Sequence, residues 1–250
     1  MARPRVILAI ETSNPSAWEA GQASRPGVAL GRVGADGVVE VLGVAGLDAT
    51  RPHDDELMPE IARVVEEAGL RARDVTDVAV SAGPGGYTAV RLAVTTAKLI
   101  AESTGARAVA VPSALVAAWK AGEGLRVRGV DRFAVAISSK GVTTHLSMFE
   151  IQSVDVRAAG EPRVVGAEVL EAALGGARVL VGDRFLPEGI RARAAALGVE
   201  IIAPEFDPVA CLHASVDMEA VDPVMLLPIY AREPEAVTKW RELVKEKKKA

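Results

Sequence analysis

Apolar and polar positions along the first half of the chain predict strands that alternate with helices. Apolar runs typical of buried strands lie at residues 5–10, 27–33, 38–43, 78–80 and 106–111. Two longer segments, 54–69 and 87–102, repeat their apolar residues at helical spacing. Strands and helices in this order are typical of an α/β lobe.

The second half of the chain shows a looser version of the same pattern. Strands are predicted at residues 133–137, 142–151, 178–181 and 199–203, and helices at 113–120, at 189–197 and from 207 onward. Ser113 is a candidate cap for the first of these helices, and Pro208 suits the first position of the last one. Glycine and charge at residues 122–129 predict a break. We therefore expect two domains, 1–121 and 122–250, of which the second is smaller and ends in a basic tail.

The segment from residue 78 to residue 104 is the most informative part of the pattern. A strand meets the glycine-rich turn 83–86, and a helix begins at Tyr87. The polar residues of that helix fall on one narrow stripe, which consists of Thr88, Arg91, Thr95, Lys98 and Glu102. Nearly all its other residues are apolar, so we expect a sheet on one side and a second helix or a partner on the other.

Two turns are candidates for phosphate binding. Gly83, Gly85 and Gly86 would let backbone N–H groups approach an anion, although neither a P-loop nor a dinucleotide motif is present and an ordinary strand-to-helix connection is the alternative. The first strand ends in Glu11, Thr12 and Ser13, which is a second candidate. Local backbone capping is the favoured interpretation of Thr12 and Ser13, and the role of Glu11 stays open.

Composition narrows the classes of function. The net charge of −4 offers no global basic field for nucleic acid, and half of the residues are hydrophobic. We expect a cytoplasmic protein without a membrane segment or signal peptide. The single Cys211 cannot form an internal disulfide and is expected on the buried face of a short helix.

The histidines and the lysine-rich tail have ordinary interpretations. His53, His145 and His213 are far apart in the sequence and lack metal-ligand spacing, so no metal site is expected. His53 is read as an exposed or capping residue. The terminal lysines are read as a solvated helix end, with contact to RNA phosphates as the alternative. They are Lys245, Lys247, Lys248 and Lys249.

Several of these motifs together resemble the bacterial TsaB family, also called YeaZ. The segments that carry the resemblance are ILAIETS (7–13), RPHDDELMPEI (51–61), SAGPGGYTAVRLAVTTAKLIA (81–101), AVAVPSALVAA (108–118) and PIYAR (228–232). They span nearly the whole chain, and residues 83–98 are the most specific part. TsaD, from the same superfamily, is the next most similar family, but it has a histidine pair for its metal where only His53 stands here.

The resemblance implies an actin-like ASKHA fold with two ribonuclease-H-like lobes, the second of them reduced. It implies a part in making N6-threonylcarbamoyladenosine at position 37 of tRNA, as a scaffold and activator without catalytic activity of its own. The implied partners are a TsaD-type catalytic subunit, a TsaE-type ATPase and, through the complex, tRNA; a homodimer is a further possibility. No intrinsic cofactor is implied, although ATP or ADP with Mg could lie at the complex interface. The expected interface consists of Leu57, Ile61, Val65, Tyr87, Val90, Arg91, Val94 and Lys98.

The chain departs from the family pattern at several positions. Ala89 and Ala93 replace glycines, Gly86 replaces a serine, residues 14–26 form a longer turn, and residues 138–140 differ in type. Three alternatives therefore stay open. They are a diverged TsaB paralogue with another partner, an ASKHA-type kinase or ATPase that uses Glu11 and the 81–86 loop for Mg-nucleotide, and a metallopeptidase.

Overall fold

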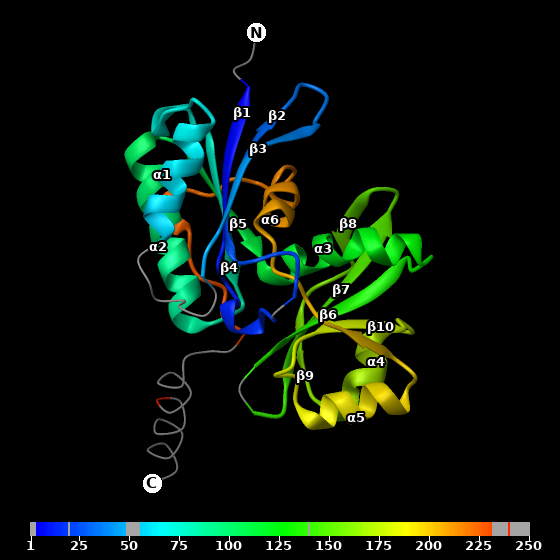
Figure 1. Ribbon diagram of the computed structural model, residues 1–250. Coiled ribbons are helices and arrows are strands. Elements are labelled where there is room, and N and C mark those ends of the chain that lie inside the picture. Colours follow the sequence, from blue (N-terminus) through cyan, green and yellow to red (C-terminus); the bar gives the residue numbers. More distant parts are fainter. Residues whose placement is uncertain (1–3, 20, 49–55, 140, 232–239, 241–250) are drawn as a thin grey trace.

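The chain forms two α/β lobes, each built on a mixed sheet with helices on both faces (Figure 1). The computed structural model describes residues 4–19, 21–48, 56–139, 141–231 and 240. Of the helices within these residues, none is long and apolar enough to cross a membrane.

The first sheet has the strand order β3-β2-β1-β4-β5. Its strands in the described residues are β1 (Arg5–Glu11), β2 (Gly27–Val33), β3 (Val39–Gly46), β4 (Asp77–Gly83) and β5 (Arg107–Pro112). The first three strands pair antiparallel, whereas β4 runs parallel to β1 and β5 parallel to β4. The central strand β1 is buried along nearly its whole length because helices cover both faces of the sheet.

The second sheet repeats this arrangement with the order β8-β7-β6-β10-β11, and β9 also pairs with β7. The strands are β6 (Arg132–Ser138), β7 (Thr144–Gln152), β8 (Asp155–Ala158), β9 (Arg163–Val165), β10 (Val179–Gly182) and β11 (Glu200–Ile202). A central strand again has an antiparallel hairpin on one side and parallel strands on the other. This repeated topology confirms the expected pair of ribonuclease-H-like lobes in an actin-like fold.

The helices of the described residues are α1 (Leu57–Glu67), α2 (Tyr87–Thr104), α3 (Ser113–Val127), α4 (Leu170–Leu174), α5 (Glu188–Ala196) and α6 (Pro208–Ser215). The short 3-10 segments are η1 (Pro15–Ala17), η2 (Ala72–Asp74), η3 (Ala167–Val169) and η4 (Pro223–Met225). Helices α1 and α2 share a core with one face of the first sheet, and α6 packs on its other face. Helix α3 contributes to the cores of both lobes, and α4 and α5 cover the outer face of the second sheet.

The chain returns to the first lobe after completing the second sheet. Asp207 caps α6 by accepting hydrogen bonds from the N–H groups of Val209 and Ala210, and Pro208 occupies the expected first position. Cys211 is buried, as its apolar neighbours predict. The stretch after α6 then pairs with β5 and passes along α2. The division at residues 121 and 122 stays a prediction, but part of the later stretch packs on the earlier lobe.

Two local predictions are wrong. The break expected at residues 122–129 is absent, because α3 continues to Val127 and buries Leu125. Gly122 fits within this helix because a Cβ at that position would crowd Val156 of the β8 hairpin. Ser113 is not a side-chain cap, since its hydroxyl is hydrogen-bonded to that of Ser81 at 2.8 Å. The short elements β8, β9 and α4 were also not expected from the sequence pattern.

Candidate functional sites

The end of β1 and the glycine turn after β4 lie against each other. The backbone N–H of Gly86 donates a hydrogen bond to the carbonyl oxygen of Ser13 at 2.7 Å, and the side chain of Asn14 donates to the carbonyl oxygen of Pro84 at 3.2 Å. The two candidate phosphate-binding turns therefore form one hydrogen-bonded structure, in which each turn uses polar groups of the other.

Glu11 lies inside this structure with one carboxylate oxygen occupied and the other unpartnered. Its Oε1 accepts hydrogen bonds from both the backbone N–H and the hydroxyl of Ser13, each at 2.7 Å. Its Oε2 is buried without a partner among the described residues. Burial raises the pKa of Glu11 to about 7, even though the nearby Ser81 hydroxyl and the hydrogen bonds from Ser13 act in the opposite direction. The carboxylate of Glu11 therefore caps the backbone N–H of Ser13. The hydroxyl of Ser13 donates to the same carboxylate and does not itself cap the backbone.

The glycines of the turn leave room for this chain's own carbonyl groups. A Cβ on Gly85 would overlap the carbonyl oxygen of Ser13, and a Cβ on Gly83 would overlap that of Ile229. Gly83 also has a positive φ of 107°, which favours glycine. The space beside these two glycines is thus filled by electronegative oxygens, which disfavour a phosphate at the same positions.

The segment that replaces a short turn after β1 connects the two lobes. We call residues 14–19 and 21–26 the linking loop. Arg184 of the second lobe donates hydrogen bonds to the carbonyl oxygens of Ser16 and Trp18, at 2.7 and 3.5 Å. Ala17 is buried in the core of the second lobe. The linking loop therefore joins the end of β1 in the first lobe to the core and surface of the second lobe.

The aliphatic residues expected at a partner interface lie instead in the core of the first lobe. All five are at most 6% exposed, and they are Leu57, Ile61, Val65, Val90 and Val94. The polar residues expected there are nearer the surface. Arg91 donates a hydrogen bond to the hydroxyl of Tyr87 at 2.7 Å, and Lys98 donates to the carbonyl oxygen of Val224 at 2.7 Å.

A different set of apolar side chains is exposed beside them. We define the α2 surface as Tyr87, Leu92 and Leu99 of α2 together with Val224, Met225, Leu227 and Tyr230 of the segment that follows α6; each is 41–65% exposed. The contacts of Lys98 with Val224 and of Tyr87 with Tyr230, whose rings stack at 5.7 Å, place this segment along α2. The periodicity of α2 could have indicated Leu92 and Leu99, because they share the face of Thr88 and Thr95.

The departures from the family pattern have specific positions in the structure. Ala89 and Ala93 are buried, so their methyl groups pack inside the first lobe rather than on the α2 surface. Ser138 donates a hydrogen bond to Asp183 at 3.2 Å, and Ser139 donates to the carbonyl oxygen of Thr143 at 3.1 Å. Lys140, His53 and the lysines of the tail lie outside the described residues.

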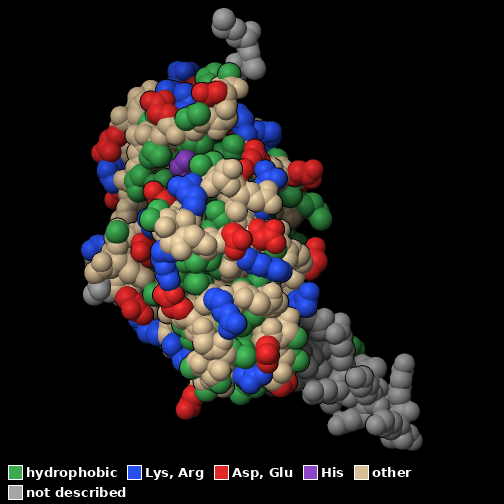
Figure 2. Space-filling view, turned by 90° about the vertical axis from the view of Figure 1, so that its right-hand side faces the viewer, with side chains coloured by type: hydrophobic (Ala, Val, Ile, Leu, Met, Phe, Trp, Pro, Cys, Tyr) green, Lys and Arg blue, Asp and Glu red, His purple; other side chains and the backbone are tan. Residues whose placement is uncertain are grey.

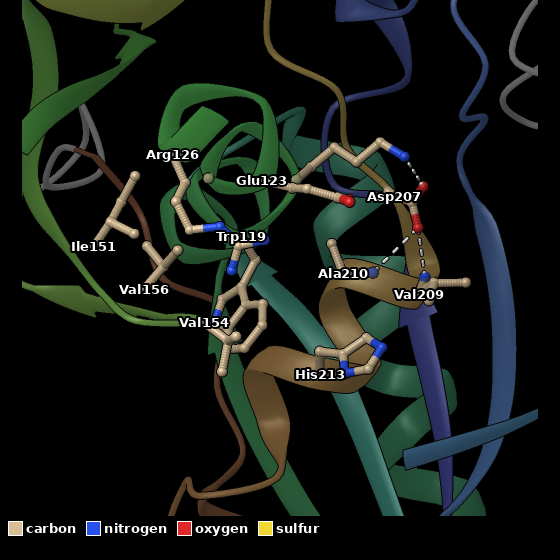
Figure 3. A pocket seen from close by; sticks show the side chains of 12 residues that line it. Trp119, Glu123, Arg126, Ile151, Val154, Val156, Asp207, Val209, Ala210 and His213 are labelled. Atoms are coloured by element: carbon tan, nitrogen blue, oxygen red, sulfur yellow. Dashed lines mark hydrogen bonds and ion pairs between the residues drawn. The ribbon is translucent and has the colours of Figure 1, made fainter. Parts of the chain in front are cut away.

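A cavity of about 330 Å³ lies at the junction of the lobes (Figure 3). It is bordered by α3, by α6 and by the β7–β8 hairpin, which contributes Ile151, Val154 and Val156. Lys120 and Asp207 form an ion pair at 2.9 Å at its edge. Burial alone would raise the pKa of Asp207, but hydrogen bonds from Ser24 and Lys120 hold it below its ordinary value. Sequence reasoning missed this site because its residues are distant in the chain.

Comparisons with known proteins agree with the resemblance found in the sequence. Residues 37–138 match the family model for TsaD, the tRNA N6-adenosine threonylcarbamoyltransferase. The structure of YeaZ from Pseudomonas aeruginosa is similar, with 20% sequence identity, a TM-score of 0.64 and coverage of 90% of this chain and 99% of that chain. An uncharacterized protein with similarity to peptidase YeaZ, from the same organism, gives 20% identity, a TM-score of 0.62 and coverage of 91% and 100%. This chain therefore has the fold of YeaZ.

Proposed function

We propose that this YeaZ-like chain is a non-catalytic subunit that binds a TsaD-type catalytic subunit and supports synthesis of N6-threonylcarbamoyladenosine at position 37 of tRNA. In this role it scaffolds and activates the catalytic subunit, and a TsaE-type ATPase acts on the same complex. The fold and the matched segment, which runs from β3 to β6 and includes α1 and α2, support the proposal.

The observation that carries the proposal is the α2 surface. Its seven large apolar side chains come from two adjacent segments of the first lobe, and they lie beside Arg91 and Lys98. A cluster of exposed apolar and aromatic side chains next to basic ones is typical of a protein–protein interface. Within the interface expected from the sequence, Tyr87, Arg91 and Lys98 remain in the proposed interface, whereas the buried aliphatic residues belong to the core of the first lobe.

The geometry gives less support to a Mg-nucleotide-dependent kinase or ATPase. That function needs the Glu11 turn to face a nucleotide, but the side chain of Glu11 is fully buried. The close approaches allowed by Gly83 and Gly85 are taken by carbonyl oxygens of this chain. A nucleotide at these turns would first have to displace the carbonyl groups of Ser13 and Ile229.

The proposal is tested by co-purification with the TsaD-type protein of the same organism, followed by threonylcarbamoyl transfer to tRNA with and without this chain. The wild type should form a complex and raise the transfer activity. Replacing Leu92 and Leu99 together by Glu should weaken the complex by roughly 100-fold, because two charges would be placed in an apolar interface.

The control for the Leu92 and Leu99 variant introduces the same charges at exposed apolar positions of the second lobe. Val142 and Val164 of the second lobe are 78% and 50% exposed, and their double Glu variant should bind as the wild type does. Val94→Glu is unsuitable as a test, since Val94 is buried and a charge there would disrupt the fold. A complex that survives the Leu92 and Leu99 changes would disprove the α2 surface as the interface. Absence of any complex with the wild type would refute the proposed function itself.

A further inference from the structure

The cavity at the junction of the lobes combines an aliphatic wall with charged groups on a facing helix. Ile151, Val154 and Val156 of the β7–β8 hairpin form the aliphatic wall. Trp119 of α3 and His213 of α6 stack at 5.8 Å and border the cavity from another side (Figure 3). At about 330 Å³ the cavity has the size of a small-molecule site.

The charges that border the cavity sum to zero, but they are not all paired with one another. Lys120 and Asp207 neutralise each other in their ion pair. Burial lowers the pKa of His213, so its ring is neutral at pH 7. Glu123 and Arg126 remain, one helical turn apart on α3. Arg126 donates a hydrogen bond to the carbonyl oxygen of Ser153 at 3.2 Å, which leaves further N–H groups of its guanidinium for a ligand.

We propose that this cavity binds a small zwitterion with an apolar side chain, namely a free aliphatic α-amino acid. The guanidinium of Arg126 binds the α-carboxylate, Glu123 accepts hydrogen bonds from the α-ammonium group, and the side chain packs on the aliphatic wall. A ligand with only a carboxylate would bind Arg126 but leave Glu123 without a cationic partner. A ligand with only an ammonium group would bind Glu123 but leave Arg126 without an anionic partner. A zwitterion satisfies both.

The surface around the second lobe agrees with a ligand that carries no net charge. Figure 2 shows acidic and basic side chains interspersed on this side of the molecule, without a field of one sign. A polyanion such as a nucleic acid or a nucleotide triphosphate would need a concentration of positive charge. The inference does not depend on the partner proposed above, because the cavity and the α2 surface involve different residues.

The probe for the test is leucine, titrated into the full chain while the indole N–H signal of Trp119 is followed by NMR. We expect saturable binding in the millimolar range. Replacing Arg126 by Gln, or Glu123 by Gln, should weaken binding about tenfold or more, since each change removes a charge-assisted hydrogen bond. Two analogues of leucine should bind more weakly than leucine by a similar factor. They are 3-methylbutylamine, which lacks the carboxylate, and 4-methylpentanoate, which lacks the ammonium group.

Arg128→Gln is the matched control. Arg128 follows the end of the same helix but pairs with Glu200 outside the cavity, so this variant should bind leucine as the wild type does. The proposal is overturned if leucine produces no saturable shift, if either analogue binds as tightly as leucine, or if Arg128→Gln weakens binding as much as Arg126→Gln. Circular dichroism of each variant establishes that these exposed substitutions leave the fold intact.

Discussion

At the scale of single residues, the buried turn at the end of β1 concentrates unusual chemistry. Glu11 is shielded from water, and only one of its carboxylate oxygens has hydrogen-bond partners among the described residues. Such a carboxyl is more easily accommodated when protonated, because an unpaired buried charge is costly. Gly85 approaches a carbonyl oxygen more closely than any other residue type could. The buried carboxyl of Glu11 and the close approach at Gly85 each lead to a prediction about the free energy of unfolding.

Stability should fall with rising pH because of Glu11. Its pKa of about 7 in the folded protein lies above that of an exposed Glu, so the folded state binds more protons between about pH 4.5 and 7. The stabilisation that protonated Glu11 contributes to the folded state is complete below about pH 4.5 and is lost as the pH rises through 7. Relative to Glu11→Gln, the wild type should lose up to about 3 kcal/mol of unfolding free energy between pH 4.5 and 8. Urea denaturation at several pH values measures this, and parallel profiles for the two proteins would contradict it.

Gly85→Ala should destabilise the protein, whereas Gly124→Ala should not. A methyl group on Gly85 overlaps the carbonyl oxygen of Ser13, so the two turns must separate at a cost of about 1–3 kcal/mol. Gly124 lies within α3 with no atom near its missing Cβ, and alanine there should add up to about 1 kcal/mol of stability. Chemical denaturation of both variants tests the contrast. Equal effects would mean that the close approach at Gly85 is unimportant.

At the scale of elements, the sequence predicts the helices and strands that are determined by residues close together in the chain. The strand at residues 27–33 and the start of α2 at Tyr87 are confirmed, because an apolar run and a glycine turn mark them directly. The break expected near Gly122 is wrong, since a contact with Val156 more than thirty residues away sustains the helix. The sequence marks the exposed side of α2 only in part: Leu92 and Leu99 share a face with Thr88 and Thr95, but the sheet that covers the opposite face is set by tertiary packing. The cavity and the linking loop are likewise made by contacts between distant segments.

The linking loop should exchange its amide hydrogens faster when Arg184 is replaced. Arg184→Ala removes two hydrogen bonds to backbone carbonyls of the loop, and exchange in residues 14–19 should rise roughly tenfold. Arg178→Ala is the control, because Arg178 donates a comparable bond to the carbonyl oxygen of Leu197 within the second lobe. Faster exchange of the loop in both variants would show that it responds to general destabilisation and not to loss of this contact.

At the scale of the whole molecule, the two lobes share structural elements. Helix α3 contributes side chains to both cores, and α6 returns from the second sheet to cover the first. Arg5 at the start of β1 donates a hydrogen bond to the carbonyl oxygen of Val216, 211 positions later. The lobes are therefore not independent along the chain, and a substitution in α6 should act on the earlier lobe.

Leu212→Ala should loosen the first sheet specifically. Leu212 is fully buried in the core that α6 shares with β1 and β2, and its loss should cost about 2–5 kcal/mol. Leu174→Ala removes a similarly buried side chain from the outer core of the second lobe. Hydrogen exchange should accelerate in β1 and β2 with Leu212→Ala and remain slow there with Leu174→Ala. The reverse pattern would disprove the structural dependence of the first lobe on α6.

The position of α6 has a consequence for synthesis of the protein on the ribosome. The strands β1, β2, β4 and β5 are translated early, but one apolar face of their sheet is covered by residues 208–215, which are translated in the last fifth of the chain. Until α6 is translated, this face has only the partial cover that α3 provides, and exposed apolar surface of this kind invites aggregation and chaperone binding. The first lobe begins to be translated before the second lobe but is completed after it. Ribosomes stalled before residue 208 should therefore carry nascent chains that remain sensitive to protease.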